Sequence, residues 1–339
     1  MKNPAEREII RIFAKEFDRK HVLPLGFDDD VSAVPLTSQL WLIVKTDMLV
    51  ASTDIPRGMT DQEAARKAVV ATVSDFAAKG VQPRALMVSI GLPRPAPAAK
   101  IRQIALGLDQ ASREYNCKII GGDTNEAECL VIDVAGVGTV SPQKLVRRNG
   151  ARPGDVVAVT GPFGKSAAGL IILKSKRKTA SAMYHGLTNA VRHPRARLEE
   201  GLALASTGGV TSSIDSSDGL ALSLHQLAQA SNVGICLDAI PIAPEVESFS
   251  RTFGLSGVDL ALYGGEEYEL VLTVRPEKFS VLKKRVRSLL KVGLVVPANK
   301  GVTATRGGKL VRIRERGWEH FRRHSGHGDK VSNLTSITT

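Results

Sequence analysis

The sequence contains few aromatic residues, three cysteines and no long apolar run. Aromatic residues make up 4% of the 339 residues, so the core has to be built from Val, Ile, Leu and Ala. This composition favours α/β layers over a β-sandwich with an aromatic core. The longest apolar run, at residues 40–44, is strand-sized and far below the roughly 18 residues that span a bilayer. The sequence therefore predicts no membrane-spanning helix and no membrane partner.

The three cysteines, Cys117, Cys129 and Cys236, are too few and too far apart for a disulfide framework or a zinc site. They are typical of reduced thiols in a cytosolic protein. The N-terminal segment is charged and has apolar residues at helical spacing, but it lacks the apolar stretch and cleavage site of a signal peptide. These features predict a cytoplasmic protein.

Acidic residues are outnumbered, and the formal net charge is +12. A basic surface can attract nucleic acid, acidic membranes or phosphorylated small molecules. Here the basic residues are dispersed or stand in short runs such as 174–178, 283–287 and 312–316, and no run is interleaved with aromatic residues for base stacking. The pattern favours a solvated surface, and nucleic acid is not an expected partner.

The length predicts two domains, because 339 residues exceed one ordinary core. Apolar residues at 43% and charged residues at 24% exclude the disordered and fibrous classes. A turn-rich stretch at 149–155 separates two apolar strand-like runs, so we expect domains at 1–150 and 151–321 and a polar, disordered tail at 322–339. The expected strands are 40–45, 86–91, 118–121, 130–140, 156–160 and 270–274, and the expected helices are 61–79, 98–115, 219–230 and 276–290.

Aspartates gather at turns and at the ends of strand-like runs, although the chain is basic. They are Asp28, Asp29, Asp30, Asp47, Asp54, Asp75, Asp123, Asp215 and Asp218. Loops at strand ends are where open α/β folds bind ligands. If several of these carboxylates converge, their repulsion requires cations, and oxygen ligands favour Mg²⁺ or Mn²⁺ over zinc or copper. Convergent Mg²⁺ beside phosphate-binding loops is typical of phosphoryl transfer.

Each aspartate also has an ordinary structural interpretation, because Asp caps helices and fills turns. That interpretation suffices for any single aspartate but not for the whole set. Among the histidines, no general base is evident.

Two glycine-rich segments are candidate phosphate loops. The first, TGPFGKS at 160–166, has Val159 where a P-loop needs glycine, so a strand–turn–helix junction is the better interpretation. The second, IGGDT at 120–124, has glycines that let backbone amides approach a phosphate, followed by an acid.

Eight motifs occur in order along the chain and together identify a family. They are GFDDD at 26–30, KTDMLV at 45–50, VSDFAAKG at 73–80, GGDT at 121–124, RNGARPGD at 148–155, SAAG at 166–169, DSSDGL at 215–220 and GGEEYE at 264–269. This series resembles the thiamine-monophosphate kinase family, within the superfamily of ATP-binding proteins like aminoimidazole-ribonucleotide synthetase. The resemblance runs from about residue 24 to Phe321.

The resemblance implies an α/β protein (α+β layers) with the two-domain fold of aminoimidazole-ribonucleotide synthetase. It implies that the domain at 1–150 binds ATP and metal and forms the interface of a homodimer. The domain at 151–321 would complete the nucleotide and substrate site. It further implies ATP and thiamine monophosphate as substrates, several Mg²⁺ ions as cofactors, and transfer of the γ-phosphate of ATP to give thiamine diphosphate.

Site residues follow from the same motifs. The implied metal ligands are Asp30, Thr46, Asp47, Asp75, Asp123, Asp215 and Asp218, of which Asp30, Asp75 and Asp218 are also the implied catalytic residues. The implied contacts to ATP are Thr46, Gly122, Asp123, Arg148 and Ser217. Arg148 suits a phosphate because guanidinium offers bidentate, permanently charged donors. The implied contacts to thiamine monophosphate are Asp54, Glu266 and Trp318, where an aromatic face over the thiazolium gives a cation–π contact.

The chain departs from the family pattern at four positions. Asp28 replaces the second glycine of the first motif, Lys45 stands where Ser is usual, and Thr72 stands where Asn is usual. Asp54 replaces a histidine that is frequent in bacterial relatives, and its carboxylate would offer a counter-charge to a cationic substrate. Direct in-line transfer is the expected mechanism, because an acceptor phosphate oxygen is already deprotonated and needs little help from a base.

Two alternatives stay open on the sequence alone. One is another ATP-dependent kinase or synthase of the same superfamily with a different small acceptor. The other is a diverged, non-catalytic paralogue that binds nucleotide or nucleic acid through its basic surface.

Overall fold

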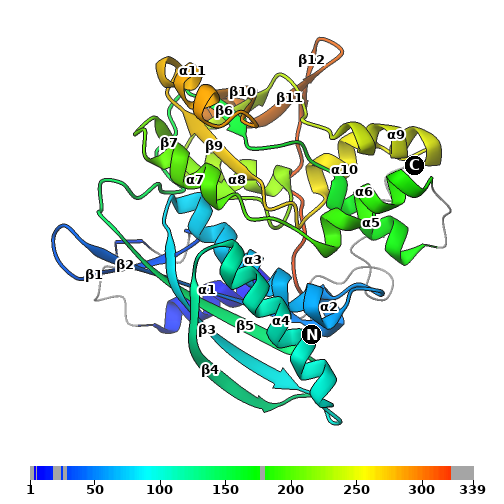
Figure 1. The fold of residues 1–339 in the computed structure, drawn as a ribbon. Helices are drawn as coiled ribbons and strands as arrows, with labels where there is room; N and C mark the ends of the chain where they lie inside the picture. The colour runs from blue at the N-terminus through cyan, green and yellow to red at the C-terminus, as the bar shows by residue number, and fades with distance from the viewer. Residues whose placement is uncertain (1–3, 5, 18–23, 26–28, 176–179, 322–339) are drawn as a thin grey trace.

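The computed structural model describes the chain except for residues 1–3, 5, 18–23, 26–28, 176–179 and 322–339. Asp28 and the predicted tail therefore lie outside the described residues. The described chain forms two α/β units, one below the other in Figure 1, each built on its own β-sheet. The predicted α/β fold class with two packed units is confirmed.

The first sheet has the strand order β1-β2-β5-β3-β4. Its pairs are antiparallel except β3 with β4, which run parallel. The bounds are β1 Ser32–Pro35, β2 Trp41–Val50, β3 Pro83–Leu92, β4 Lys118–Glu126 and β5 Val131–Val140. The helices of this unit are α1 Glu6–Glu16, α2 Ala51–Asp54, α3 Asp61–Lys79 and α4 Ala98–Glu114.

The second sheet has the strand order β12-β11-β8-β10-β6-β9-β7. The strands are β6 Val156–Val159, β7 Val210–Asp215, β8 Gly234–Leu237, β9 Leu270–Val274, β10 Leu290–Val296, β11 Val302–Arg306 and β12 Lys309–Arg312. The helices are α5 Lys165–Lys174, α6 Ser181–Arg192, α7 Leu198–Ala205, α8 Leu220–Ser231, α9 Pro244–Phe253, α10 Gly257–Tyr263 and α11 Pro276–Arg285, with a 3₁₀ turn η1 at Ala298–Lys300.

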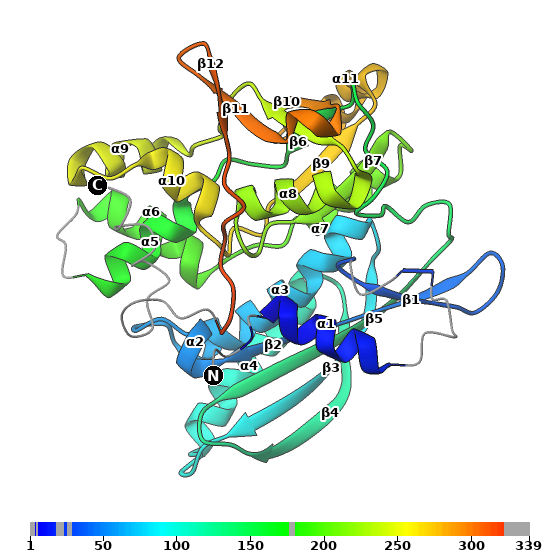
Figure 2. The ribbon, with the colours of Figure 1, turned by 180° about the vertical axis from the view of Figure 1, so that it is seen from behind.

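Helix α3 lies between the two sheets and is buried on nearly all sides (Figures 1 and 2). It packs against β2 and β5 of its own unit and against β7 and α7 of the other. Its ends are well defined: Thr60 and Glu63 form a reciprocal capping box, and Gly80 follows the last turn in the left-handed conformation. A helix buried all round is expected to be largely apolar, and α3 is rich in Ala and Val, although it also buries Lys67, Asp75 and Lys79.

The apolar core runs continuously through α3 from one unit to the other. A single cluster joins Val73 and Leu86 of the first unit to Leu198, Leu270 and other residues of the second. A second cluster lies between α8 and the seven-stranded sheet, and a third is formed by α5, α6, α9 and α10. The units are therefore held together by core packing as well as by polar contacts.

Several predicted elements differ from the observed ones in length. The predicted helix at 61–79 is confirmed, whereas the helix predicted at 276–290 ends at Arg285 because the chain turns into β10. Strand β2 continues through Asp47 to Val50, and β4 continues through the GGDT motif to Glu126. Gly122 therefore lies in an extended edge strand and not in a loop. A Cβ at Gly122 would meet the backbone oxygen of Val88 at 1.8 Å, which explains the glycine without a ligand.

In the part of the chain that the structure describes, no helix combines the length and apolar composition needed to cross a bilayer. Cys117, Cys129 and Cys236 are free thiols, as the sequence predicts.

We expect the close approach of α7 to α3 to be sensitive to one methyl group. A Cβ at Gly201 would lie 2.1 Å from the backbone oxygen of Ala77. Gly201→Ala should therefore lower the free energy of unfolding by about 1–3 kcal/mol, measured by chemical denaturation. Gly186→Ala is the matched control, because Gly186 is exposed in a helix and has open space at its Cβ. That control should gain up to about 1 kcal/mol from helix propensity. Equal stability of the two variants would contradict the packing argument.

Candidate functional site

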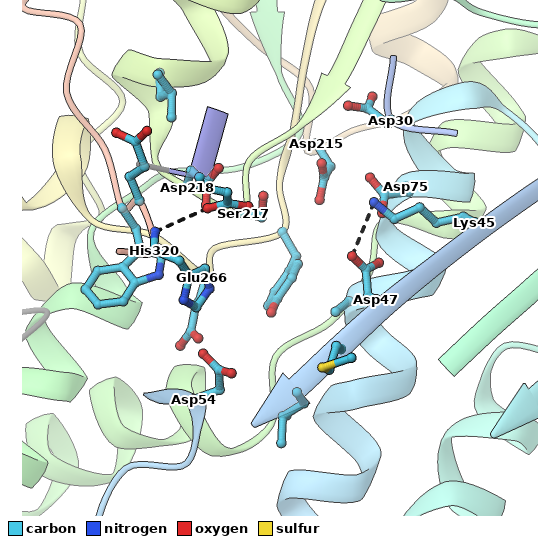
Figure 3. Close-up of a pocket in the computed structure, with 18 of the residues that line it drawn as sticks. Asp30, Lys45, Asp47, Asp54, Asp75, Asp215, Ser217, Asp218, Glu266 and His320 are labelled. Carbon is cyan, nitrogen blue, oxygen red and sulfur yellow. Dashed lines mark hydrogen bonds and ion pairs between the residues drawn. The ribbon is translucent and has the colours of Figure 1, made fainter. Parts of the chain in front are cut away.

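A cavity of about 840 Å³ lies where the two units meet. It is lined by β2 and α3 of the first unit, by the loops after β7 and before β9 of the second, and by the segment after β12. In Figure 2 that last segment, drawn in red, runs down from the upper unit to the region of α1 and α2. The lining therefore comes from segments far apart in the sequence. Figure 3 shows acids at both ends of this cavity.

One face of α3 supplies charged groups to the cavity and its surroundings. Asp75 and Lys79 are four residues apart and so are neighbours on the surface of the helix, and Lys67 lies about two turns before Asp75. Lys67 and Asp75 line the cavity together with Ala68 and Ala71. The small alanines leave space between the two charged groups.

Three buried carboxylates converge at one end of the cavity. Asp30 precedes β1, Asp75 lies in α3, and Asp215 ends β7, yet one oxygen of each lies within 4.8 Å of the others. The hydroxyl of Ser74 donates a hydrogen bond of 2.8 Å to Asp215 Oδ2. Both sheets and α3 thus contribute to a single acidic cluster.

Burial and mutual repulsion disturb the titration of this cluster. Burial raises the pKa of Asp75 well above its ordinary value, even though Lys45 lies beside it. Burial also raises the pKa of Asp215 to about 7, and the negative charge of Asp30 adds to this shift. Burial and repulsion both destabilise the ionised carboxylates. A cation bound between them would relieve this destabilisation.

Three cations lie against the cluster, of which Lys79 is fully buried and Lys45 and Arg148 are partly buried. Lys79 is fully buried and its Nζ lies 2.6 Å from Asp29 Oδ1 and 2.8 Å from Asp30 Oδ2. Arg148 forms a second ion pair with Asp30, and its backbone N–H donates to Asp29 Oδ2 at 3.0 Å. Burial raises the pKa of Asp30, but the charges of Lys79 and Arg148 outweigh that effect and leave the pKa below its ordinary value. Lys45 Nζ lies 2.9 Å from Asp75 Oδ2.

The donor set fits Mg²⁺ or Mn²⁺. All three converging groups are carboxylates, and hard divalent cations prefer oxygen ligands. Asp47 borders the same space, and its buried Oδ2 has no hydrogen-bond partner among the described residues. A buried, unpartnered carboxylate oxygen is costly unless a cation or water completes it.

At the opposite end of the cavity, Asp54 and Glu266 lie close together (Figure 3). Asp54 Oδ2 accepts hydrogen bonds from the Val50 N–H at 2.9 Å and from the Thr53 hydroxyl at 3.0 Å. Glu266 lies in the loop before β9 with a positive φ of 63°. Lys67 Nζ donates to Glu266 Oε1 at 2.6 Å and to the backbone oxygen of Asp54 at 2.9 Å.

The segment after β12 places aromatic side chains over the cavity. The backbone N–H of Trp318 donates to the backbone oxygen of Asp218 at 3.0 Å, and the backbone N–H of His320 donates to Glu6 Oε2 at 3.2 Å. The rings of Trp318 and His320 meet edge to face, with centroids 5.7 Å apart. Glu6 belongs to α1, so both ends of the described chain border this cavity.

Most of the residues that the sequence singles out line this cavity. They are Asp30, Thr46, Asp47, Asp54, Asp75, Arg148, Asp215, Ser217, Asp218, Glu266 and Trp318. The hydroxyl of Thr46 nevertheless donates to Asp133 Oδ1 at 2.7 Å, on the neighbouring strand. Gly122 and Asp123 do not line the cavity: they are exposed on the edge strand β4, three strands away from β2.

Sequence reasoning missed three groups at the site: Lys67, Lys79 and Tyr268. Tyr268 is buried against the cavity, and burial raises its pKa well above the ordinary value. The two lysines could have been noticed in the sequence, because Lys67 lies eight residues before Asp75 and Lys79 lies four residues after it in a predicted helix. Lysines in an otherwise apolar helix are unusual unless they are paired.

The segment at 160–166 forms the junction that its sequence predicts. Glu267 Oε1 accepts hydrogen bonds from the Gly164 N–H at 2.8 Å and the Ser166 N–H at 2.9 Å. The N-terminus of α5 is thus satisfied by a side chain of the same protein. Burial raises the pKa of Glu267 to about 8. Residues 160–166 do not line the cavity described above.

The sequence is similar to a known protein family and to proteins of known name. Residues 28–140 match the family model described as AIR synthase related protein, N-terminal domain. The chain is 38% identical over 321 residues to a thiamine-monophosphate kinase of Nitrosopumilus maritimus, covering 94% of this chain and 98% of that protein. It is 37% identical to a thiamine-monophosphate kinase of Pyrococcus abyssi, covering 93% of this chain and 96% of that protein.

A solved structure, AaThiL complexed with AMPPCP and TMP, has a similar fold. Its TM-score is 0.82 at 28% identity, over 93% of this chain and 97% of that one.

Proposed function

The chain belongs to the thiamine-monophosphate kinase family, and we propose that it transfers the γ-phosphoryl group of ATP to thiamine monophosphate, giving thiamine diphosphate. A single observation carries this proposal. One cavity holds a buried carboxylate cluster at one end and two further acids with a tryptophan at the other. The first end suits divalent cations with a polyphosphate, and the second suits a cationic, aromatic acceptor.

The metal end is formed by Asp30, Asp47, Asp75 and Asp215, and we propose that these carboxylates hold Mg²⁺ together with Asp218. When bound, Mg²⁺ neutralises the charge that spreads over the transferred phosphoryl group. The cluster suits this role because its own carboxylates repel one another in a buried site. The unit at 1–150 would thus supply most metal ligands, and the unit at 151–321 would complete the nucleotide and acceptor sites.

Nucleotide contacts are proposed for Arg148 and Ser217. The guanidinium of Arg148 is buried beside Asp30, and its Nε has no hydrogen-bond partner among the described residues. A guanidinium nitrogen in that position is suited to donate to a phosphate oxygen. Ser217 lies on the cavity in the loop between β7 and α8.

The acceptor end orients the thiazolium. Asp54 and Glu266 supply negative charge, and the indole of Trp318 offers a face for a cation–π contact. The acceptor phosphate would then point toward the metal end of the same cavity. Its oxygen is deprotonated at neutral pH, so direct in-line attack requires no general base from the chain.

The function is tested by incubating the purified full-length protein with ATP and Mg²⁺, with and without thiamine monophosphate. We expect ADP release to depend on the acceptor and thiamine diphosphate to appear on chromatography.

Asp75→Asn should lower kcat by about 100-fold or more, because it removes electrostatic stabilisation of the transition state. Asp109→Asn is the control, since Asp109 pairs with Arg113 on the exposed face of α4. ATP hydrolysis without thiamine diphosphate, or full turnover by Asp75→Asn, would contradict the proposal.

Lys67 is proposed to position Glu266 for the acceptor. It is buried, reaches across from α3 and pairs with Glu266 at 2.6 Å. Lys67→Met should raise the KM for thiamine monophosphate by about 10- to 100-fold, the value of a hydrogen bond to a charged group. The KM for ATP should change much less, and Lys67→Arg should restore part of the loss. Lys100→Met, which breaks a pair with Asp61 that is about one third exposed, is the control. Equal rises in both KM values would rule out a positioning role.

A second copy of the chain is our proposed partner. Met48, Met87 and Ile120 are 64%, 52% and 66% exposed on the first sheet, and Met48 points away from α3 because its neighbours in β2 point toward it. An uncovered apolar sheet face is typical of an interface. Gly122 and Asp123 lie on this sheet outside the cavity, so their expected roles would require the dimer.

Sedimentation velocity tests this assembly. The parent protein should be a dimer, and Met48→Asp should be monomeric, because a buried, unpaired carboxylate destabilises an apolar interface. Leu310→Asp should leave the dimer intact, since Leu310 is equally exposed on β12 of the other unit. A monomeric parent protein would overturn the proposal.

A further inference from the structure

Lys45 occupies an unexpected place for a lysine. It lies in the middle of β2 and projects to the same side of the strand as Asp47, toward α3. Its Nζ lies 2.9 Å from Asp75 Oδ2 and 3.2 Å from Asp47 Oδ1, so it bridges carboxylates from a strand and a helix (Figure 3). Its side chain is 23% exposed and lines the cavity.

The other two cations of the cluster contact different carboxylates from those that Lys45 contacts. Lys79 and Arg148 pair with Asp29 and Asp30, on the far side of the carboxylate cluster. Among the ion pairs of the described residues, Lys45 alone joins Asp47 to Asp75. Without its ammonium, these two carboxylates would face each other and Asp215 with no fixed positive charge between them.

The Lys45 ammonium lies between two carboxylates from different elements, which is a position that suits a divalent ion. An ammonium is a compact point charge, and three donors allow it to contact several carboxylate oxygens at once. Unlike a bound ion, it is tethered to the chain, and its pairs with Asp47 and Asp75 form without metal. A divalent ion could enter the same space only by displacing the ammonium against direct charge repulsion.

The charges of the cluster agree with this interpretation. With every group ionised and Asp218 left aside, five carboxylates, those of Asp29, Asp30, Asp47, Asp75 and Asp215, face three fixed cations, those of Lys45, Lys79 and Arg148. Two negative charges remain, which is the charge that one divalent ion neutralises. Without Lys45 the remainder would be three, and a single divalent ion would leave the cluster negative.

We propose that the Lys45 ammonium takes the place of one divalent cation in the site, so that this chain binds one ion fewer than it would with an oxygen ligand at position 45. The proposal rests on the metal-dependent function proposed above. It concerns how many ions the chain holds, which is measured without turnover.

Mn²⁺ binding by the full-length protein tests the proposal. The number of Mn²⁺ ions per chain is counted by electron paramagnetic resonance in the presence of a non-hydrolysable ATP analogue. Lys45→Ser replaces the ammonium by a hydroxyl ligand and should bind one more Mn²⁺ per chain than the parent protein. Lys45→Arg keeps the positive charge and should bind the parental number. Lys165→Met, which removes a lysine from an exposed pair with Glu245, should also bind the parental number.

Thermal unfolding provides a second measurement that does not depend on Lys45→Ser folding well. In EDTA, Lys45→Met should unfold at a lower temperature than the parent protein, because Asp47, Asp75 and Asp215 lose their fixed cation. Mg²⁺ should raise the unfolding temperature of Lys45→Met more than that of the parent protein.

Two results would overturn the inference. One is an unchanged number of Mn²⁺ ions in Lys45→Ser with the same Mg²⁺ response in Lys45→Met as in the parent protein. The other is a gain of an ion in Lys45→Arg, because charge would then not be what excludes it. A protein that gained the ion in Lys45→Ser yet formed no thiamine diphosphate would refute the proposed acceptor and leave the inference about Lys45 standing.

Discussion

Everything at this site depends on α3, a helix that is buried on nearly all sides and still carries charged residues. Placing a charge in an apolar interior costs several kcal/mol unless the charge is paired. Helix α3 meets this constraint with both signs, because Asp75 pairs with Lys45 while Lys79 pairs with Asp29 and Asp30. The acids that would hold metal are therefore fixed by the same contacts that let the two units pack together.

The same helix joins the two ends of the cavity. Lys67 and Asp75 both line the cavity from α3, about two turns apart, and a rigid helix keeps a constant distance between them. Lys67 pairs with Glu266, a proposed contact to the acceptor, and Asp75 belongs to the carboxylate cluster that we propose holds metal. In the proposed function, the separation between donor and acceptor would thus be set largely by secondary structure. Loops supply other groups of the site, among them Asp30, Arg148, Ser217, Asp218, Glu266 and Trp318.

Much of this arrangement is predictable from the sequence, and the limits have physical causes. Helix α3 is predictable because Thr60 and Gly80 mark its ends, and the aspartates of the cluster are conspicuous in a basic chain. The strand order is not predictable from the sequence, because it depends on pairing between distant segments. Strand β7, for example, joins the edge of its sheet by pairing with β9, some 60 residues later in the chain. The conformation of the GGDT motif is not predictable either, because the close approach of Gly122 to Val88 in an edge strand looks the same in sequence as a phosphate loop.

The buried lysines show most clearly why a site cannot be read from its acids alone. A sequence pattern of aspartates implies repulsion that cations must relieve, but it does not say whether those cations are ions or side chains. Lys79 and Lys45 could both have been surface residues, and only the fold places Lys79 at zero exposure beside Asp29 and Lys45 between two carboxylates. Charge balance is a property of the assembled cluster. The number of ions that such a cluster takes up should therefore be argued from its paired lysines and arginines as well as from its ligands.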